Sequence, residues 1–298
     1  MAGGGVIGAG RVIVVTGCDE HHFHLAADTL ASLRDLGPAG FDIGFVHVGP
    51  ADLPGEMAAA ADKVARVDDA EYRARPRQGF ALAYLGVKAR LPEFFPGYDV
   101  YVWLDGDTWV QNVVGIATLV EAAKTGDIGA HLESDINYAR TPHPDYRSIS
   151  IYYSLFPELD AGSFNRYPML NGGVFAATAS SPLWAKWGGL LAAIRERDAA
   201  RPNQFYSDQI PLHYLSVMGE VRATPVSSLN NWQLYTALPT FNLARGLLLS
   251  PFPPYYEINI LHLAGVTKDS RFQIGPSGET ATFRYRDVRV LLGKAKVR

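Results

Sequence analysis

The sequence contains only one cysteine, Cys18, among 298 residues. A single thiol excludes an intrachain disulfide and any zinc site built from several cysteines, and it fits a reducing compartment. A chain of this length buries enough apolar surface to fold without a disulfide or a structural metal. Any metal that the protein binds is therefore expected to serve its function.

Long hydrophobic runs and an excess of one charge are also absent. No stretch of about 18 uncharged apolar residues is present, and the apolar N-terminal segment is interrupted by Arg11 and lacks the basic region of a signal peptide. The 27 basic and 30 acidic residues give a net charge of −3. This balance disfavours binding to nucleic acid through a globally basic surface. We expect a cytoplasmic protein that is at most peripheral at the inner face of the membrane.

Apolar, β-branched runs alternate with amphipathic stretches over the first part of the chain. Strands are predicted at 11–16, 41–48, 63–67 and 98–104, and helices at 25–36, 56–62 and 80–95. Further elements are predicted at 168–178 (strand), 182–197 and 209–217 (helices) and 258–263 (strand). Strands that alternate with helices are typical of βαβ units. The sequence therefore predicts an α/β fold with a mostly parallel central sheet flanked by helices.

A single domain with a C-terminal basic appendage is the organisation that we expect. Residues 1–10 are interpreted as a flexible leader, 11–281 as the domain and 282–298 as a basic tail. From Thr282 onward the chain carries six basic residues against one acid, Asp287. Such a segment is usually a solvated face, and contact with an anionic membrane surface is the alternative interpretation.

The motif Asp105-Gly106-Asp107 directly follows the apolar run that ends at Leu104. In open α/β sheets, ligands bind outside the carboxyl ends of the strands. Two carboxylates this close repel each other once they are desolvated, and a divalent cation removes that cost. A bound cation can also hold a nucleotide diphosphate. A solvated turn is the alternative interpretation, but the position at a strand end favours the metal site.

His262 ends the predicted strand at 258–263 and begins the segment H-L-A-G-V-T-K. A neutral imidazole suits a borderline metal such as Mn²⁺. Gly265 permits a close approach of the backbone, and Lys268 can place a compact positive charge on a phosphate. Taken alone, His262 is best interpreted as a core histidine, whereas together with D-G-D it is predicted to bind metal.

Two further motifs are each open to a plain structural interpretation. The glycines of N-G-G at 171–173 mark a bulge or a close backbone approach, and Asn171 can both donate and accept, as sugar recognition requires. The S-D-Q sequence at 207–209 is typical of a helix start, in which Ser207 or Asp208 caps the first turn. Only their occurrence in one sequence with D-G-D and His262 suggests a functional role.

The four motifs in this order resemble those of the GT-A-fold nucleotide-sugar glycosyltransferases. They are D-G-D at 105–107, N-G-G-V at 171–174, D-Q at 208–209 and H-L-A-G-V-T-K at 262–268. The closest resemblance is to the retaining, family-8-like group that contains glycogenin and bacterial lipopolysaccharide galactosyl- and glucosyltransferases. It covers about residues 11–268 and implies a Rossmann-like GT-A fold.

The resemblance also implies an activity, a cofactor and partners. The activity would be metal-dependent transfer of a hexose, with retention of anomeric configuration, from a nucleotide-sugar to a hydroxyl acceptor. A UDP-sugar is the expected donor, and a carbohydrate, a lipid-linked sugar or another hydroxyl compound is the expected acceptor. The loops at 133–148 and 230–256 are expected to shape the acceptor pocket.

Residue roles follow from the resemblance by position. It implies that Mn²⁺, or Mg²⁺ in its place, is bound by Asp105, Asp107 and His262. It implies that the donor nucleotide-sugar is contacted by Cys18, Asp19, Lys88, Asp105, Gly106, Gly172, Gly265 and Lys268. Within that set, Cys18 and Asp19 fall beside the base and Lys88 beside the phosphate or sugar. The catalytic residues near the anomeric carbon are expected to be Asn171, Asp208 and Gln209.

Several residues depart from the family pattern. Gly172 replaces an alanine, Lys268 is followed by Asp269 rather than by the usual proline and tryptophan, and Glu133 stands where an aspartate that contacts the sugar is common. Two rival functions therefore stay open. One is a metal-dependent nucleotidyltransferase that acts on sugar phosphates, and the other is a nucleotide-sugar binding module without catalysis.

Overall fold

The computed structural model describes residues 10–67, 86–138, 167–197, 207–273 and 280–295, together with Ile7, Leu155, Phe156 and Phe164. These residues form a central sheet of seven strands in the order β3-β2-β1-β4-β7-β6-β8. The strands are β1 (Val12–Cys18), β2 (Asp42–Val48), β3 (Lys63–Val67), β4 (Val100–Leu104), β6 (Ile128–Leu132), β7 (Leu170–Thr178) and β8 (Ala223–Val226). Within this described sheet, β7 runs antiparallel to its neighbours β4 and β6, and the other pairs are parallel.

The central strands β1 and β4 are almost wholly apolar because helices cover both faces of the sheet. Every residue of β1 and β4 is buried, and burial on both faces selects a continuous apolar run instead of an alternating one. The strands predicted at 11–16, 41–48, 63–67, 98–104 and 168–178 are confirmed.

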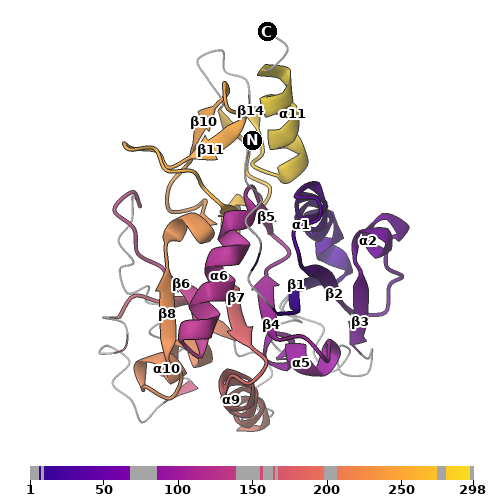
Figure 1. Cartoon of the computed structure of the whole chain (residues 1–298), viewed down its shortest axis with the longest axis vertical. Coiled ribbons are helices and arrows are strands. Elements are labelled where there is room, and N and C mark those ends of the chain that lie inside the picture. Colours follow the sequence, from indigo (N-terminus) through magenta and orange to yellow (C-terminus); the bar gives the residue numbers. More distant parts are fainter. Residues whose placement is uncertain are drawn as a thin grey trace.

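Helices α1 (Phe23–Asp35), α2 (Gly55–Ala60) and α6 (Val113–Thr125) pack on one face of the sheet. Leu30 of α1 and Ile116 of α6 belong to the core cluster on that face. Helices α9 (Leu183–Arg197) and α10 (Gln209–Val217) cover the other face, where Trp187 and Leu212 are fully buried. Figure 1 shows α1 and α6 side by side on their face of the sheet.

The helix predicted at 80–95 differs from the structure. Residues 80–85 lie outside the described part, and the rest forms a 3-10 helix, η2 (Val87–Arg90), followed by the short α5 (Leu91–Phe94). Gly86 has a left-handed φ of 62°, which no continuous right-handed helix contains. A single helix through this segment is therefore wrong, and the interruption at Gly86 places Lys88 in the 3-10 helix η2.

A smaller three-stranded sheet continues from the end of β4. It consists of β5 (Thr108–Val110), β12 (Ile260–His262) and β9 (Trp232–Gln233) in the order β5-β12-β9. Between these strands in sequence lie η4 (Ser228–Asn230) and the hairpin of β10 (Thr240–Asn242) and β11 (Leu247–Leu249). The strand predicted at 258–263 corresponds to β12.

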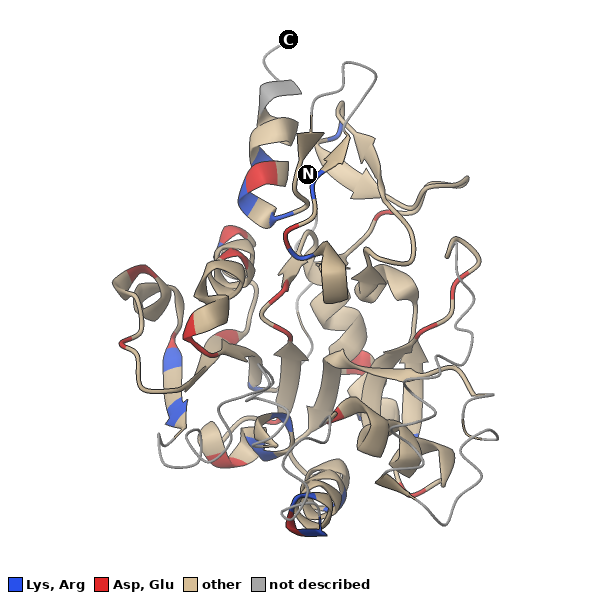
Figure 2. Cartoon of the chain, turned by 180° about the vertical axis from the view of Figure 1, so that it is seen from behind, with Lys and Arg blue, Asp and Glu red and all other residues tan. Residues whose placement is uncertain are grey.

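The chain ends, within the described residues, at one pole of the molecule. Two short 3-10 helices follow strands: η1 (Glu20–His22) comes after β1, and η5 (Gly265–Thr267) comes after β12. The last elements are β13 (Phe272–Gln273), β14 (Thr280–Ala281) and α11 (Tyr285–Ala295). Figure 1 shows α11 beside β10, β11 and β14, and Figure 2 shows basic and acidic residues interspersed on α11. Its side chains Tyr285, Val288 and Leu292 are buried in a third core cluster with Trp109. None of the helices in the described part of the chain combines the length and hydropathy of a membrane span.

Candidate metal centre

The D-G-D turn joins the large sheet to the small one. Thr108 donates to the Asp105 carbonyl through its backbone N–H at 3.0 Å and through its hydroxyl at 2.8 Å. From α1, the Thr29 hydroxyl donates to the carbonyls of Gly106 at 3.0 Å and Thr108 at 2.5 Å. A Cβ on Gly106 would lie 3.3 Å from the Gly17 carbonyl oxygen. The turn is therefore held tightly against the end of β1 and against α1.

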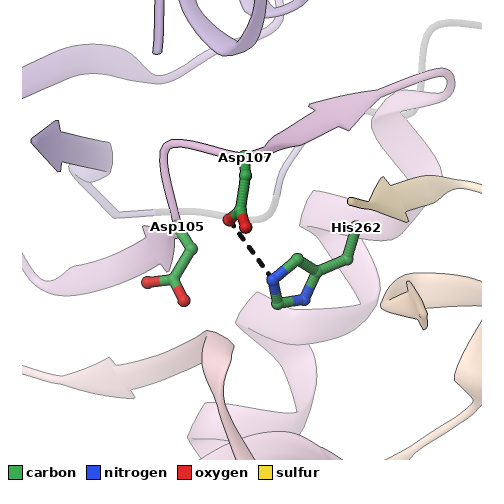
Figure 3. Close-up of side chains that lie close together, drawn as sticks. All are labelled: Asp105, Asp107 and His262. Carbon is green, nitrogen blue, oxygen red and sulfur yellow. Dashed lines mark ion pairs between the residues drawn. The ribbon is translucent and has the colours of Figure 1, made fainter. Parts of the chain in front are cut away.

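Strand β12 brings His262 to this turn from a distant part of the sequence. In the antiparallel pairing of β12 with β5, His262 lies opposite Thr108, and the Leu263 N–H donates to the Asp107 carbonyl at 2.8 Å. The His262 Nε2 then lies 3.3 Å from Asp107 Oδ1. Figure 3 shows the imidazole directed at Asp107, with Asp105 beside them at the end of β4.

Asp105, Asp107 and His262 form the group that can bind a metal. One ligand atom from each lies within 4.8 Å of the others, and no second such group occurs among the described residues. Asp107 and His262 are 8% and 4% exposed. Carboxylate oxygens with one imidazole nitrogen suit Mn²⁺ or Mg²⁺ rather than a thiophilic metal. The residues predicted to bind metal are thus brought together.

Electrostatics at this group show how strongly it attracts positive charge. Burial alone would raise the pKa of Asp107, but the charges and hydrogen bonds of His262 and Lys268 hold it well below its usual range. Burial alone would lower the pKa of His262, and Asp107 outweighs it and raises the pKa. Asp107 and His262 therefore each favour the charged form of the other, because a buried carboxylate requires a cationic partner.

Lys88 links the D-G-D motif to the D-Q motif. Its ammonium lies 2.9 Å from Asp105 Oδ1 and 3.0 Å from Asp208 Oδ2, and it donates to the Gly172 carbonyl at 3.1 Å. Lys88 is 7% exposed. Burial would lower its pKa, but the two carboxylates raise it well above the usual value, so the side chain stays charged.

Asp208 does not cap the helix that it precedes. Its side chain makes no cap hydrogen bond to α10, and the Ser207 hydroxyl accepts from the Ile210 N–H at 3.4 Å instead. The Asp208 carboxylate pairs with Lys88, while its backbone carbonyl accepts from the Trp187 indole at 3.0 Å. Of the two predicted caps, Ser207 is therefore the one present, and the Asp208 side chain is available to the site.

The N-G-G segment in β7 packs directly on the metal group. A Cβ on Gly173 would lie 2.5 Å from His262 Cε1, 2.8 Å from Asp105 Oδ2 and 3.0 Å from Asn171 Oδ1. On Gly172 the nearest atom would be Leu212 Cδ2 at 3.5 Å, an ordinary contact. Gly173 is thus the glycine whose lack of a side chain the metal group requires, and the donor contact expected of Gly172 stays a prediction.

Glu133 gathers three side-chain amides around one carboxylate oxygen. Its Oε1 accepts from Asn171 Nδ2 at 2.7 Å, from Gln209 Nε2 at 3.1 Å and from Gln233 Nε2 at 3.2 Å. The Gln209 Oε1 accepts from the Gly172 N–H at 3.3 Å. The predicted catalytic residues Asn171 and Gln209 are therefore neighbours, oriented by Glu133.

Gly265 and Lys268 lie at the turn after β12. Gly265 has a left-handed φ of 64°, a conformation that suits glycine. The ammonium of Lys268 lies 3.1 Å from Asp107 Oδ2, and its side chain is 33% exposed. Lys268 thus combines contact with the metal group and access to solvent.

Cys18 and Asp19 lie at the carboxyl end of β1, and both are buried. Burial raises the pKa of the Cys18 thiol well above its ordinary value, which makes it a poor nucleophile. Asp19 Oδ1 lies 2.6 Å from His22 Nδ1. Among the described residues nearby, three buried polar atoms lack a hydrogen-bond partner: Thr16 Oγ1, Glu20 Oε2 and His47 Nε2. Buried polar atoms without partners suit a site that a polar ligand completes.

Sequence reasoning missed Asn231 altogether and did not single out Gly173 or Gln233. Asn231 is fully buried and contacts both His262 and Asn171. It lies in the irregular segment before β9, where neither a periodicity nor a spacing marks it. Only the pairing of β9 with β12 brings it to the metal group.

Comparison with solved structures identifies the fold. The crystal structure of the galactosyltransferase LgtC in complex with donor and acceptor sugar analogs aligns over 95% of this chain and 95% of its own, with a TM-score of 0.57 and 13% identity. The apo form of mouse xyloside xylosyltransferase 1 aligns over 85% of this chain and 97% of its own, with a TM-score of 0.52 and 14% identity. No family model and no curated protein matches the sequence.

An active-site mutant of LgtC is similar to the same extent, with a TM-score of 0.55, 12% identity and 95% of both chains covered. At these identities the likeness establishes the fold. The predicted α/β architecture, with one mostly parallel sheet flanked by helices, is confirmed. The chain has the GT-A fold of the LgtC type of glycosyltransferase structure.

Proposed function

We propose that this chain is a metal-dependent glycosyltransferase that moves a hexose from a UDP-sugar to a hydroxyl acceptor with retention of configuration. The observation that carries the proposal is the placement of Asp105, Asp107 and His262 within 4.8 Å at the end of β4. On this fold, the carboxyl ends of the strands are where ligands bind. The proposed donor and acceptor classes agree with the sugar analogs in the LgtC structure.

The chemistry requires cations behind the leaving group. When the bond between the sugar and the diphosphate breaks, negative charge grows on the phosphate and positive charge grows on the anomeric carbon. Mn²⁺ or Mg²⁺ held by Asp105, Asp107 and His262 would neutralise the developing phosphate charge. Lys268, whose ammonium is partly exposed beside Asp107, adds a second positive charge to the same side of the site.

Residues on the sugar side supply negative and polar groups. The Asp208 carboxylate, 3.0 Å from Lys88, stabilises the positive charge on the anomeric carbon. Gln209 and Asn171 are held by Glu133 and position the sugar hydroxyls. In a reaction with retention, the acceptor hydroxyl attacks from the face that the diphosphate leaves, so the acceptor proton passes toward the leaving phosphate oxygen.

Thermal unfolding with UDP tests the donor site. UDP at about 100 times its dissociation constant should stabilise the native state by about 2.7 kcal/mol. We expect this stabilisation only when Mn²⁺ is present, and we expect it to vanish in Asp107→Ala. Asp269→Ala is the matched control, because Asp269 follows Lys268 but its side chain is 76% exposed. Stabilisation by UDP that persists without Mn²⁺ and in Asp107→Ala would contradict the proposal.

Product analysis separates the rival functions. A glycosyltransferase releases UDP from a UDP-hexose, whereas a nucleotidyltransferase acting on a sugar phosphate and UTP releases pyrophosphate. A binding module shows metal-dependent UDP binding and neither product. NMR of the anomeric proton in the transferred sugar tests retention, and an inverted configuration would overturn that part of the proposal.

A further inference from the structure

Asn231 bridges the metal group and the N-G-G segment. Its Oδ1 lies 2.9 Å from His262 Nδ1, and its Nδ2 donates to Asn171 Oδ1 at 2.9 Å. The side chain is fully buried, so water does not compete for either bond. A single amide therefore contacts a metal ligand on one side and a sugar-side residue on the other.

The orientation of Asn171 is set from both of its ends. The Gly173 backbone N–H, which can only donate, lies 2.8 Å from Asn171 Oδ1. The Glu133 carboxylate, which only accepts when ionised, lies 2.7 Å from Asn171 Nδ2. Reversing the amide would place two donors together at one end and two acceptors together at the other. Asn171 therefore presents its oxygen to Asn231.

This orientation passes to Asn231 and then to His262. Because Asn171 presents an acceptor, Asn231 turns its Nδ2 toward Asn171, which leaves its Oδ1 facing the imidazole. An amide oxygen accepts only, so the Nδ1 of His262 must carry the proton. The other ring nitrogen, Nε2, is the one that faces Asp107.

We propose that Asn231 is a positioning residue that keeps the proton of His262 on Nδ1 and thereby presents Nε2 to the metal. Metal-ligating histidines commonly need such a partner for the second ring nitrogen, because it fixes the tautomer and the ring orientation. The directed chain from Glu133 through Asn171 and Asn231 also ties the metal group to the sugar side. This inference rests on the metal-binding part of the proposed function.

Calorimetry of Mn²⁺ binding tests the role of Asn231. We expect Asn231→Leu, which has nearly the same volume, to weaken Mn²⁺ binding about 10- to 100-fold. Asn230→Leu is the matched control: Asn230 is also buried, but its Oδ1 accepts from Asn259 Nδ2 at 2.8 Å and it makes no described contact with His262. Its Mn²⁺ affinity should equal that of the wild type. Equal affinities for wild type and Asn231→Leu would overturn the inference.

Two further variants separate positioning from general packing. Asn231→Asp retains an acceptor for Nδ1–H, so it should bind Mn²⁺ more tightly than Asn231→Leu, and equal weakening would overturn the inference. Asn171→Ala should also weaken Mn²⁺ binding, although Asn171 is not among the proposed ligands. Combining it with Asn231→Leu should add little further loss, because the two residues act in one chain. Fully additive losses would contradict the chain.

A direct measurement does not depend on any variant. In a long-range ¹H–¹⁵N spectrum of the wild-type protein loaded with diamagnetic Zn²⁺ as the probe metal, His262 should be protonated at Nδ1 and metal-bound at Nε2. The opposite assignment would overturn the inference. If the wild type binds neither Mn²⁺ nor Zn²⁺, the metal site of the proposed function fails first, and this outcome is distinguishable from a wild type that binds metal without help from Asn231.

Discussion

The ammonium of Lys88 lies 3.0 Å from the Asp208 carboxylate and 2.9 Å from that of Asp105. These two aspartates come from different elements, and each side chain is at least partly buried. Lys88 also donates to the Gly172 carbonyl, so its ammonium has three acceptors within the protein, one for each of its N–H groups. Lys88 therefore links the D-G-D, N-G-G and D-Q motifs. Its expected contact with the nucleotide-sugar stays a prediction.

Replacing this cation should destabilise the protein. Lys88→Met leaves two carboxylates without their shared partner, and removing one member of a buried ion pair costs about 3–5 kcal/mol. We expect this decrease in the free energy of unfolding by urea titration, with partial recovery when Mn²⁺ supplies positive charge next to Asp105. Lys124→Met, which removes a surface pair with Glu121, should change stability by less than about 1 kcal/mol. A similar small change in both variants would contradict this account.

Gly173→Ala and Gly172→Ala should behave differently although the two glycines are adjacent. The new methyl group at 173 would lie 2.5 Å from His262 Cε1 and 2.8 Å from Asp105 Oδ2, so the metal ligands must move. Overpacking of this kind costs about 1–3 kcal/mol, which corresponds to roughly a 5- to 150-fold loss of Mn²⁺ affinity if it falls on the ligands. At 172 the methyl group has room, and Mn²⁺ affinity should be unchanged. Calorimetry that finds the same affinity in both variants would rule out this steric explanation.

His131 should make the fold sensitive to acid. Burial lowers the pKa of His131 to about 4, whereas an unfolded histidine has a pKa of about 6.5. Above about pH 6.5 both states are neutral and the group has no effect. As the pH falls from about 6.5 to about 4, the unfolded state binds a proton that the folded state excludes, so stability decreases, by roughly 3 kcal/mol for this one group.

His131→Gln removes this titration. Between about pH 6.5 and pH 4, the free energy of unfolding should fall less steeply in the variant than in the wild type. The comparison uses the slope against pH, because the absolute stability also changes when the contact of His131 Nε2 with the Tyr138 hydroxyl is lost. Parallel slopes would show that His131 is not the group responsible. His213, whose pKa burial also lowers to about 4, should account for part of the remaining slope.

Helix α11 should contribute to stability, unlike a solvated basic tail. Leu292 is 4% exposed in the cluster that contains Trp109, whereas Val290 is 54% exposed. Leu292→Ala should lower the free energy of unfolding by about 2–5 kcal/mol, and Val290→Ala should change it by less than about 0.5 kcal/mol. Urea denaturation of both variants checks this, and an equally small effect in both would mean that the helix does not pack on the domain in solution.

The sequence of α11 shows amphipathic spacing, but it does not show that the apolar face of the helix is buried. Tyr285, Val288 and Leu292 recur at helical intervals, yet the surrounding arginines favoured a solvated segment. In the fold, Arg284 Nε lies 3.0 Å from Asp28 Oδ2 in α1, and the Trp109 indole donates to the Phe283 carbonyl at 2.9 Å. Asp28 and Trp109 lie far from α11 in sequence. A local pattern therefore cannot reveal that they hold this segment against the domain.

The sequence by itself determined the strands and the residues with chemical capacity. Continuous apolar runs specify strands covered on both faces, and the charged residues at their ends, above all Asp105 and Asp107, specify where ligands gather. Motif order added the GT-A resemblance, which the structure bears out as a fold. The metal roles and catalytic roles of these residues stay predictions.

Only the tertiary structure decided which residues share a site and what each one contacts. The pairing of β12 with β5 brings His262 to Asp107, and the pairing of β9 with β12 brings the neighbourhood of Asn231 to both. Whether Asp208 caps a helix or faces Lys88 depends on how segments remote in sequence are placed. The same holds for the two glycines, where the nearest atom would lie 2.5 Å from a Cβ at 173 and 3.5 Å from one at 172. Local propensities carry no information about such distances, because they arise from the order and register of the strands.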